Sequence, residues 1–144
     1  MRDGQVRRMS RLHRRLYQLT GGRVGQRLVD NDILLLTTAG RHTGLIHTVP
    51  LLYLREGNTL VVIASYGGRD LHPAWYLNLV AAPDVEVQVR KRRFKARARV
   101  ADVVERASWW PRVVEAYGDY AVYQTRTERV IPVVLMEVHS QDAP

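Results

Sequence analysis

The sequence predicts a small α+β domain in which a mostly antiparallel β-sheet closes into a barrel. About six short runs rich in Val, Ile, Leu and Thr are separated by turn residues. Only three helical segments are found, too few to alternate with the strands as in a parallel sheet. A chain of 144 residues, 46% of them hydrophobic, is long enough for one domain with a sizeable core.

The first 30 residues form a basic lead-in, and we place the single barrel domain at residues 31–144. Residues 1–30 contain eight arginines and two aspartates. Apolar side chains recur at steps of three and four from Gln5 to Leu19, which predicts an amphipathic helix ended by Gly21-Gly22. Such a helix can lie on an anionic membrane surface or pack its apolar side on the domain, and both interpretations stay open.

Three strands are expected first, at residues 33–38, 47–54 and 59–65, arranged as a meander. The first is continuously apolar or β-branched and is expected to be buried on both faces. Pro50 has no N–H to donate, so the second strand is expected at an edge or at a bulge. Residues 55–58 are expected to form the turn into the third strand.

A polar loop at residues 66–72 leads into a short helix at residues 74–81. Pro73 suits the first turn of this helix, and Pro83 closes it. Residues 85–90 and 94–100 then alternate between apolar and polar side chains, which predicts a hairpin with its charges facing outward.

The C-terminal part is expected to contain a helix and one more strand. Asp102 and Glu105 have the form of a capping box for a helix at residues 103–117. Pro111 is expected to break or kink that helix. The last apolar strand is expected at residues 131–138.

The formal net charge of +8 favours anionic partners, namely nucleic acid, acidic lipid, or a phosphorylated or polycarboxylate small molecule. Seven of the cations lie within residues 90–99, where strand alternation accounts for them as a solvated sheet face and turn. Phe94 is the only aromatic residue among them, so base stacking has little to work with. No specific nucleic-acid partner is therefore expected, although a basic binding module remains an alternative.

Several classes of site are excluded. The chain has no cysteine, which excludes disulfides, thiolate metal sites and a cysteine nucleophile and fits a reducing cytosol. No apolar run approaches the ~20 residues of a membrane span, and the N-terminus lacks the apolar stretch of a signal peptide. The five histidines lack metal-ligand spacing. P-loop, Gly-x-Gly-x-x-Gly and Gly-x-Ser-x-Gly motifs are also missing.

What remains is a cofactor site without a protein nucleophile. The loop of Arg41, His42 and Thr43 lies between two glycines, and such a loop can turn backbone N–H groups and a positive charge toward an anion, although it also serves as a hairpin turn. A second small-residue loop, Ser65 to Gly68, and a Trp-Tyr pair on the short helix follow. Three phenols spaced by three, which a helical turn would place on one side, suit a pocket wall or rim: Tyr117, Tyr120 and Tyr123.

Taken in order, these segments resemble the deazaflavin-dependent nitroreductase family of actinobacteria, which includes quinone reductases. The resemblance runs from about Ile33 to Val138. It rests on Leu36-Thr37-Thr38-x-Gly40-Arg41-x-Thr43-Gly44, Pro50-Leu51, Ala64-Ser65-x-Gly67-Gly68, Pro73-x-Trp75-Tyr76-Leu77-Asn78, the three tyrosines and Ile131-Pro132.

The resemblance implies a split β-barrel that binds coenzyme F420, a deazaflavin whose tail carries a phosphodiester and several glutamates; FMN is the alternative cofactor. It implies that the loop Arg41, His42 and Thr43, with His47, holds the phosphate and tail. The ring is expected against two sets of residues: the strand backbone of Thr48, Val49, Pro50, Leu51 and Leu52, and the residues Ile63, Ala64, Ser65, Tyr66, Ala74, Trp75, Tyr76, Leu77 and Asn78.

The resemblance also implies an oxidoreductase that transfers a hydride from reduced F420 to a quinone-like, nitro or other conjugated acceptor. Its catalytic candidates are Tyr120, Tyr123, Tyr117 and Ser65, with Tyr120 also touching the cofactor. Family members commonly carry lysine at the positions of His42 and Tyr66 and arginine at that of His47. The tail therefore uses other cations here, such as Arg69, or the barrel has become a non-catalytic fatty-acid or lipid carrier.

Two expectations concern the protein's surroundings. A cytoplasmic location is expected, with peripheral contact to the inner face of the membrane through residues 5–19 as the finer alternative. Split barrels often pair, so a homodimer is a further expectation.

Overall fold

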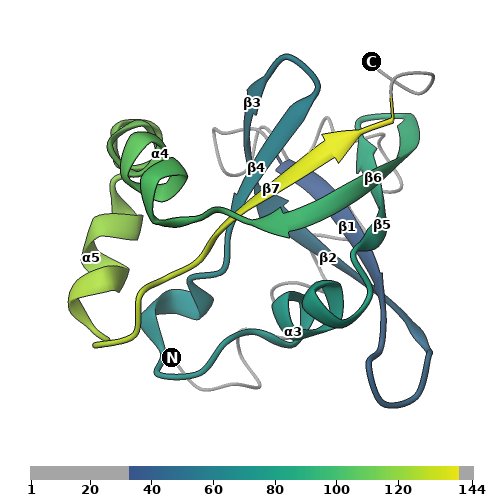
Figure 1. Ribbon diagram of the computed structural model, residues 1–144, viewed down its shortest axis with the longest axis horizontal. Coiled ribbons are helices and arrows are strands. Elements are labelled where there is room, and N and C mark those ends of the chain that lie inside the picture. The colour runs from purple at the N-terminus through teal and green to yellow at the C-terminus, as the bar shows by residue number, and fades with distance from the viewer. Residues whose placement is uncertain (1–32, 140–144) are drawn as a thin grey trace.

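A computed structural model describes residues 33–139 of the chain (Figure 1). The strands are β1 (Ile33–Ala39), β2 (Ile46–Leu52), β3 (Leu54–Glu56), β4 (Thr59–Ile63), β5 (Asp84–Val89), β6 (Arg92–Val100) and β7 (Val133–Val138). The helices are α3 (Ala74–Ala81), α4 (Val103–Ala116) and α5 (Asp119–Thr125), with a 3₁₀ turn η1 (Tyr66–Gly68). The expected helix at residues 5–19 and the basic lead-in lie outside the described residues.

The seven strands form one sheet in the order β2-β1-β5-β6-β7-β4-β3, and every pair is antiparallel. The two end strands of this order, β2 and β3, are consecutive in the chain and are separated only by Tyr53. A sheet whose two ends are joined in this way has to curl. Contact between β2 and β4 shows that it does. The predicted α+β fold with a small antiparallel split barrel is thereby confirmed.

The expected meander is wrong. β1 pairs with β2 and β3 pairs with β4, but β4 pairs on its other side with β7 rather than with β2. The predicted second strand is in fact two strands, and Leu54–Glu56 crosses to the opposite end of the sheet. The turn is correspondingly shorter, because Arg55 and Glu56 belong to β3. The prediction that the strand with Pro50 is an edge strand is confirmed.

Alternate residues of the strands fill the inside of the curled sheet. Leu34 and Leu36 are fully buried there, and α3 closes one end of the interior with Trp75 and Leu79. The others in this cluster are Leu60, Val62, Ala64, Val85, Val87, Phe94, Ala96, Ala98, Val134, Met136 and Val138. Burying one such large aliphatic side chain contributes about 1.5–3 kcal/mol. The helix bounds predicted for α3, residues 74–81, are confirmed.

A second core lies on the outer face of β4 and β7, where α4 and α5 cover it. It combines Val61, Ile63, Val133 and Leu135 with Trp109, Val113, Tyr120 and Ile131. The helix α4 runs through Pro111 from Val103 to Ala116, so the expected break is wrong. Trp109 and Val113 on either side of the proline are both buried in this core, and their packing offsets the lost backbone hydrogen bond.

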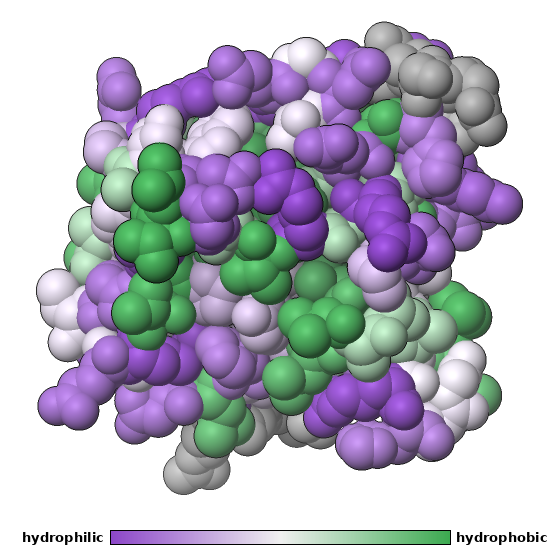
Figure 2. All heavy atoms as spheres, in the orientation of Figure 1, coloured by the Kyte–Doolittle hydropathy of each residue, from purple (hydrophilic) through white to green (hydrophobic). Residues whose placement is uncertain are grey.

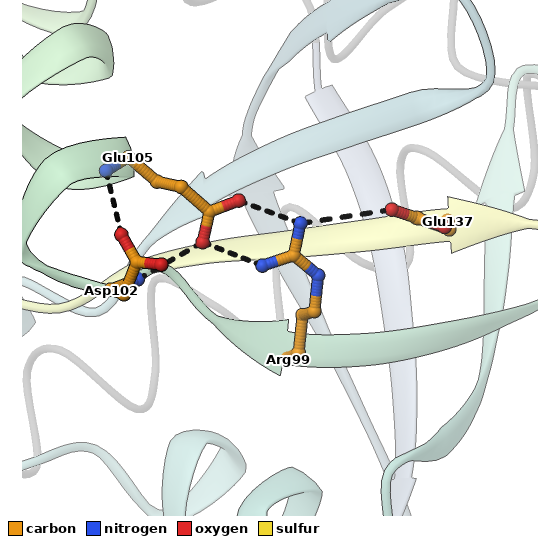
Figure 3. Close-up of polar contacts among 4 residues, drawn as sticks. All are labelled: Arg99, Asp102, Glu105 and Glu137. Atoms are coloured by element: carbon orange, nitrogen blue, oxygen red, sulfur yellow. Dashed lines mark hydrogen bonds and ion pairs between the residues drawn. The ribbon is translucent and has the colours of Figure 1, made fainter.

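The capping box predicted for α4 is confirmed, and it is tied to the sheet (Figure 3). The Asp102 carboxylate accepts from the Glu105 N–H at 2.8 Å, and the Glu105 carboxylate accepts from the Asp102 N–H at 3.1 Å. Both oxygens of Glu105 also accept from the Arg99 guanidinium at 2.7 Å. Arg99 lies 3.8 Å from Glu137 on β7 as well. This network fixes where α4 leaves β6.

Three of the seven cations in residues 90–99 stand beside carboxylates, Arg99 being one of them. Lys95 stands opposite Glu86 in the β5–β6 register, and Arg97 forms an ion pair with Asp84 at 3.1 Å. Figure 2 shows hydrophilic side chains interspersed with separate hydrophobic groups over the face seen in Figure 1. The arrangement supports the interpretation of these cations as a solvated sheet face.

The Glu105 network predicts a defined acid sensitivity. Hydrogen bonds from Arg99 and then from the Asp102 backbone lower the pKa of Glu105 from 4.5 to about 2. A carboxylate whose pKa is lower in the folded state stabilises the fold above its unfolded pKa, and this contribution is lost as the pH falls from about 4.5 through about 2. Urea unfolding at a series of pH values should show this loss in the wild type.

In Glu105→Gln, the free energy of unfolding should fall less than in the wild type as the pH is lowered from about 4.5 to about 2. Glu115→Gln, on an exposed position of the same helix, serves as the control and should keep the wild-type profile. Equal pH profiles for all three proteins would contradict the assignment.

Candidate functional site

The loop between β1 and β2 is held against α3 by one buried amide. Asn78 of α3 accepts from both the backbone N–H and the guanidinium of Arg41, each at 3.1 Å, through its Oδ1 atom. Its Nδ2 group donates to Thr38 of β1 at 3.3 Å. Asn78 is 4% exposed, whereas Arg41 lies at the surface. One of the five N–H donors of Arg41 is used in this contact.

The same loop uses most of its backbone N–H groups itself. Gly40 and Gly44 donate to the carbonyls of Leu45 and Gly40, and Leu45 donates to the Thr43 hydroxyl. Together with Arg41, four of the six N–H groups from residues 40 to 45 are thus occupied. The loop therefore offers an anion its side chains and the amides of His42 and Thr43, fewer amides than the sequence suggested.

His47 lies at the base of this loop. A Cβ atom placed on Gly40 would be 3.2 Å from the His47 Nε2 atom and 3.1 Å from the Thr43 hydroxyl oxygen. Arg41, His42, Thr43 and His47 are all exposed, so the structure brings the four predicted tail-binding residues together at one end of β1 and β2.

Of the five β2 residues expected beside the cofactor ring, only Thr48 has a polar side chain. Val49 and Leu51 pack against the inner core, and the Thr48 hydroxyl lies 2.8 Å from that of Thr37. Leu52 packs on the outer side with Ile33 and Leu35. Because β2 ends the sheet, no other strand within residues 33–139 pairs with its outer edge. That edge, including the carbonyl of Pro50, is what β2 can offer a planar ring.

The loop after β4 has an unusual backbone. Tyr66, Gly67 and Gly68 have positive φ angles of 49°, 66° and 83°. Ile63 and Ala64 just before them point into the outer and inner cores, respectively, and Ser65 is 8% exposed. Ile63, Ala64 and Ser65 can therefore offer a cofactor their backbone groups and the Ser65 hydroxyl, because the side chains of Ile63 and Ala64 are packed in the two cores.

This loop lies directly on α5, as the teal and light-green segments of Figure 1 show. A Cβ atom on Gly68 would be 2.5 Å from the carbonyl oxygen of Tyr123 and 3.0 Å from the Cβ of Arg126. The Arg126 guanidinium donates to the Gly67 carbonyl at 3.3 Å. Glycine at position 68 is what lets the Ser65 loop and the tyrosine-bearing helix touch.

The three tyrosines stand in a row. Tyr120 has edge-to-face contacts with Tyr117 at 6.1 Å and with Tyr123 at 5.9 Å between ring centroids. The Tyr117 hydroxyl donates to the carbonyl of Tyr53 at 2.8 Å, which ties the end of α4 to the β2–β3 corner. Burial, followed by its two tyrosine neighbours, raises the pKa of the Tyr120 phenol well above its usual range. Tyr120 therefore keeps its proton at neutral pH.

The helix α3 links the two sides of the site. Trp75 is 8% exposed and belongs to the core, Ala74 faces solvent, and Leu77 is half-buried. Tyr76 packs its ring on His72 at 4.6 Å between centroids, at the end of α3 that follows the Ser65 loop. Asn78, one half-turn later, contacts the β1–β2 loop. Figure 1 shows α3 between that loop and α5.

Arg69, the cation expected to take the role of a lysine at position 66, lies beside Tyr66. Its guanidinium carbon is 4.6 Å from the ring centroid of Tyr66. The expected substitute is therefore next to the position that it would serve.

Arg129 is the residue that sequence reasoning missed. It precedes β7 and donates to the carbonyls of Ala64 and Ser65 at 3.2 and 2.7 Å and to that of Arg69 at 2.7 Å. A single arginine in the run Glu128-Arg129-Val130-Ile131 has no spacing or composition that distinguishes it from other surface arginines, so no local signal could have found it.

A shallow cavity of about 200 Å³ lies on the outer face of β1, β2, β5 and β6. Thr48 is the one residue of the expected cofactor site that lines it, together with Leu35, Thr37, Ile46, Glu86, Gln88 and Arg93. Within residues 33–139, no group of three or more His, Asp or Glu side chains is arranged to hold a metal ion. No helix in that same span is both long and apolar enough to cross a membrane.

Comparison with known proteins identifies the family of this chain. A family model described as F420H(2)-dependent quinone reductase matches residues 9–138. The F420H(2)-dependent quinone reductase Rv1261c of Mycobacterium tuberculosis is 40% identical over 130 residues, which cover 88% of this chain and 87% of that protein.

Two solved structures are also similar. One, an F420-H2 dependent reductase, is 42% identical with a TM-score of 0.68 and covers 74% of this chain and 94% of its own. Another, described as a domain-swapped dimer, is 39% identical with a TM-score of 0.70 and covers 93% and 98%.

The contact at Gly68 predicts a large difference between neighbouring glycines. Gly67→Ala and Gly68→Ala both place a side chain at positive φ, which costs about 1–2 kcal/mol. Only Gly68→Ala also overlaps α5, which adds about 1–3 kcal/mol, since nothing lies within 4 Å of a Cβ on Gly67. Urea unfolding of both variants measures the difference, and equal losses of stability would show that the loop does not press on α5.

Proposed function

The chain belongs to the F420H(2)-dependent quinone reductase family, and we propose that it is an oxidoreductase that reduces a quinone with the reduced form of coenzyme F420. The observation that carries this proposal is the position of α3. Asn78 of this helix binds Arg41 of the cationic β1–β2 loop. At the start of the helix, Tyr76 packs on His72, which belongs to the loop that contacts the tyrosine-bearing helix. β2, an end strand of the described sheet, begins directly after the cationic loop.

The exposed residues fit the anionic tail of F420. Arg41 is fixed in place by Asn78 yet keeps four N–H donors, which suits recognition of a phosphate or carboxylate. His42, Thr43 and His47 stand beside it, and Arg69 with Tyr66 lies at the other loop. We propose that these residues bind the tail, with Arg69 in place of the lysine found at position 66 in relatives.

The ring would lie along Thr48 to Leu52 and against residues 63–66 and 74–78. Here the chain supplies backbone donors and acceptors at the β2 edge, because Val49, Leu51, Ile63, Ala64 and Trp75 are committed to the cores. When bound, reduced F420 supplies a hydride, since carbon replaces the N5 of a flavin. The protein's task is placement and electrostatic stabilisation.

Tyr120 is the proposed hydrogen-bond donor to the oxygen of the acceptor. Its ring is held between two other tyrosines, and no hydrogen bond to its hydroxyl is described within residues 33–139. Because burial keeps the phenol protonated, it can stabilise negative charge that develops on that oxygen, while water delivers the proton. Tyr123 is the second candidate; Tyr117 is already bonded to Tyr53. Ser65 stays a candidate through its hydroxyl. Nitro compounds are proposed as further acceptors.

The lipid-carrier alternative has no observation in its favour. The inside of the barrel is filled by side chains such as Leu34, Leu60 and Met136, each fully buried. An acyl chain would have to displace them.

The cofactor assignment is tested by parallel titration of the full chain with F420, FMN and a labelled fatty acid, read by tryptophan fluorescence. F420 should bind with a Kd in the micromolar range. Arg41→Met should weaken F420 binding about 10- to 100-fold, because it removes charge-assisted hydrogen bonds. The control is Arg55→Met, an exposed arginine of β3 that donates to the Gly57 carbonyl. Preference for FMN or the fatty acid would overturn the proposal.

Tyr120→Phe tests the role of the phenol. Loss of one such donor typically costs about 10²–10³-fold in turnover. The variant should therefore lose turnover with several acceptors while its F420 affinity changes little, and Tyr123→Phe should lose less. Stopped-flow oxidation of reduced F420 measures the rate. Wild-type turnover in Tyr120→Phe would remove it from the mechanism.

A peripheral position on the cytoplasmic face of the membrane is proposed from the basic, amphipathic pattern of residues 5–19. Deleting residues 1–20 should reduce sedimentation with acidic liposomes, and unchanged sedimentation would reject the idea. The relative described as a domain-swapped dimer supports a homodimer as well, which light scattering of the purified chain would measure.

A further inference from the structure

One guanidinium holds together the loop between β4 and α3. Arg129 donates through Nε to the carbonyl of Arg69 at 2.7 Å and through Nη2 to that of Ser65 at 2.7 Å. Its Nη1 group donates to the carbonyl of Ala64 at 3.2 Å and lies 3.2 Å from the Nδ1 atom of His72. Three carbonyls and an imidazole from four positions of one loop thus converge on a single side chain.

The backbone of Arg129 is itself held in place. The Gln124 amide of α5 donates to the Arg129 carbonyl at 2.8 Å, and the Arg129 N–H donates to the Thr127 hydroxyl at 3.2 Å. The Gln124 carbonyl oxygen accepts from Ile131 and from Arg106 of α4. The guanidinium therefore reaches the loop from a segment that two helices fix, so it can set the loop rather than follow it.

The loop needs such support because its backbone is strained. Tyr66 is a non-glycine residue at a φ of 49°, and Gly67 and Gly68 follow with positive φ. Conformations of this kind persist only when surrounding contacts over-determine them. Once β4 ends, the Ala64 carbonyl accepts a charge-assisted bond from Arg129. The Ser65 carbonyl accepts from the Gly68 N–H at 2.9 Å inside the loop and from Arg129 as a second, charge-assisted donor.

The chemistry of the contact also assigns the protonation of His72. A guanidinium has no acceptor, so the Nδ1 atom of His72 must accept and its proton resides on Nε2. Burial and then the charge of Arg129 lower the pKa of His72, which keeps the ring neutral. The Tyr76 ring lies 4.6 Å from the His72 ring, and the charge of Asp70 acts on Arg129.

We propose that Arg129 is a positioning residue of the reaction centre: it sets the backbone that presents Ser65 and Tyr66, and it fixes His72 as a neutral imidazole with its N–H at Nε2. The kinetic consequence rests on the proposed function, because these residues line the expected ring site. The structural consequence does not, since it concerns the chain alone.

The first test is NMR of the imidazoles of the full wild-type chain, with the His72 signal identified by its loss in His72→Gln. Nitrogen shifts should show the Nε2–H tautomer at neutral pH, and His72 should titrate below 6.5. In Arg129→Met the pKa of His72 should rise toward that value. Arg126→Met is the matched control: it removes a neighbouring arginine that makes one 3.3 Å bond to the same loop, and it should leave the His72 titration unchanged.

Kinetics give the second readout. Arg129→Met should lower kcat/KM for the acceptor roughly 10- to 100-fold, since small misplacements of reacting groups have effects of this size. Arg129→Lys should not restore activity, because the three donors of an ammonium group lie on one nitrogen and cannot reach four acceptors that surround a planar guanidinium. An Nδ1–H tautomer or a charged His72 in the wild type would overturn the proposal even if no variant folds, and so would full activity of Arg129→Met. Wild-type protein that shows the expected His72 signals but ignores F420 would instead overturn the proposed function.

Discussion

The architecture depends on one connection: the chain passes from one end strand of the sheet to the other across Tyr53 alone. This makes a flat sheet impossible and forces closure around the inner core. Among the described strands, it leaves β2 at one end of the sheet, and β2 comes into contact with β4 as the sheet curls. Tyr117 bonds the carbonyl of Tyr53 itself, so the same corner positions the row of tyrosines. The closure of the sheet, the position of β2 at its end and the position of the three tyrosines therefore all depend on the connection at Tyr53.

Much of the fold follows from local patterns. The helix at residues 74–81, the capping box at Asp102 and the antiparallel hairpin of β5 and β6 have local causes, and they were predicted. The pairing of β4 with β7 is a long-range contact that no local pattern reports, so the meander was predicted in its place. The effect of Pro111 on helix α4 was overestimated. The burial of Trp109 and Val113 keeps this helix continuous, and that burial is decided by tertiary packing.

The candidate site divides in the same way. Sequence motifs predicted the two loops of the candidate site, because glycines at positive φ and an exposed arginine in a turn occur at recognisable spacings. The hydrogen bonds that hold these loops in place could not be predicted, because Asn78 and Arg129 bind residues 37 to 65 positions away in the chain. The expected number of anion-binding amides was too high for a related reason: the turn that forms the loop consumes them.

The amide at position 78 has a consequence for the electric field at the mouth of the barrel. A carboxylate there would grip Arg41 more strongly, but it would also cancel its charge. The neutral oxygen of Asn78 aims the guanidinium while leaving its full positive potential directed outward. The chain thereby obtains orientation without neutralisation, and it can attract a polyanion from a distance of about a Debye length before any contact forms.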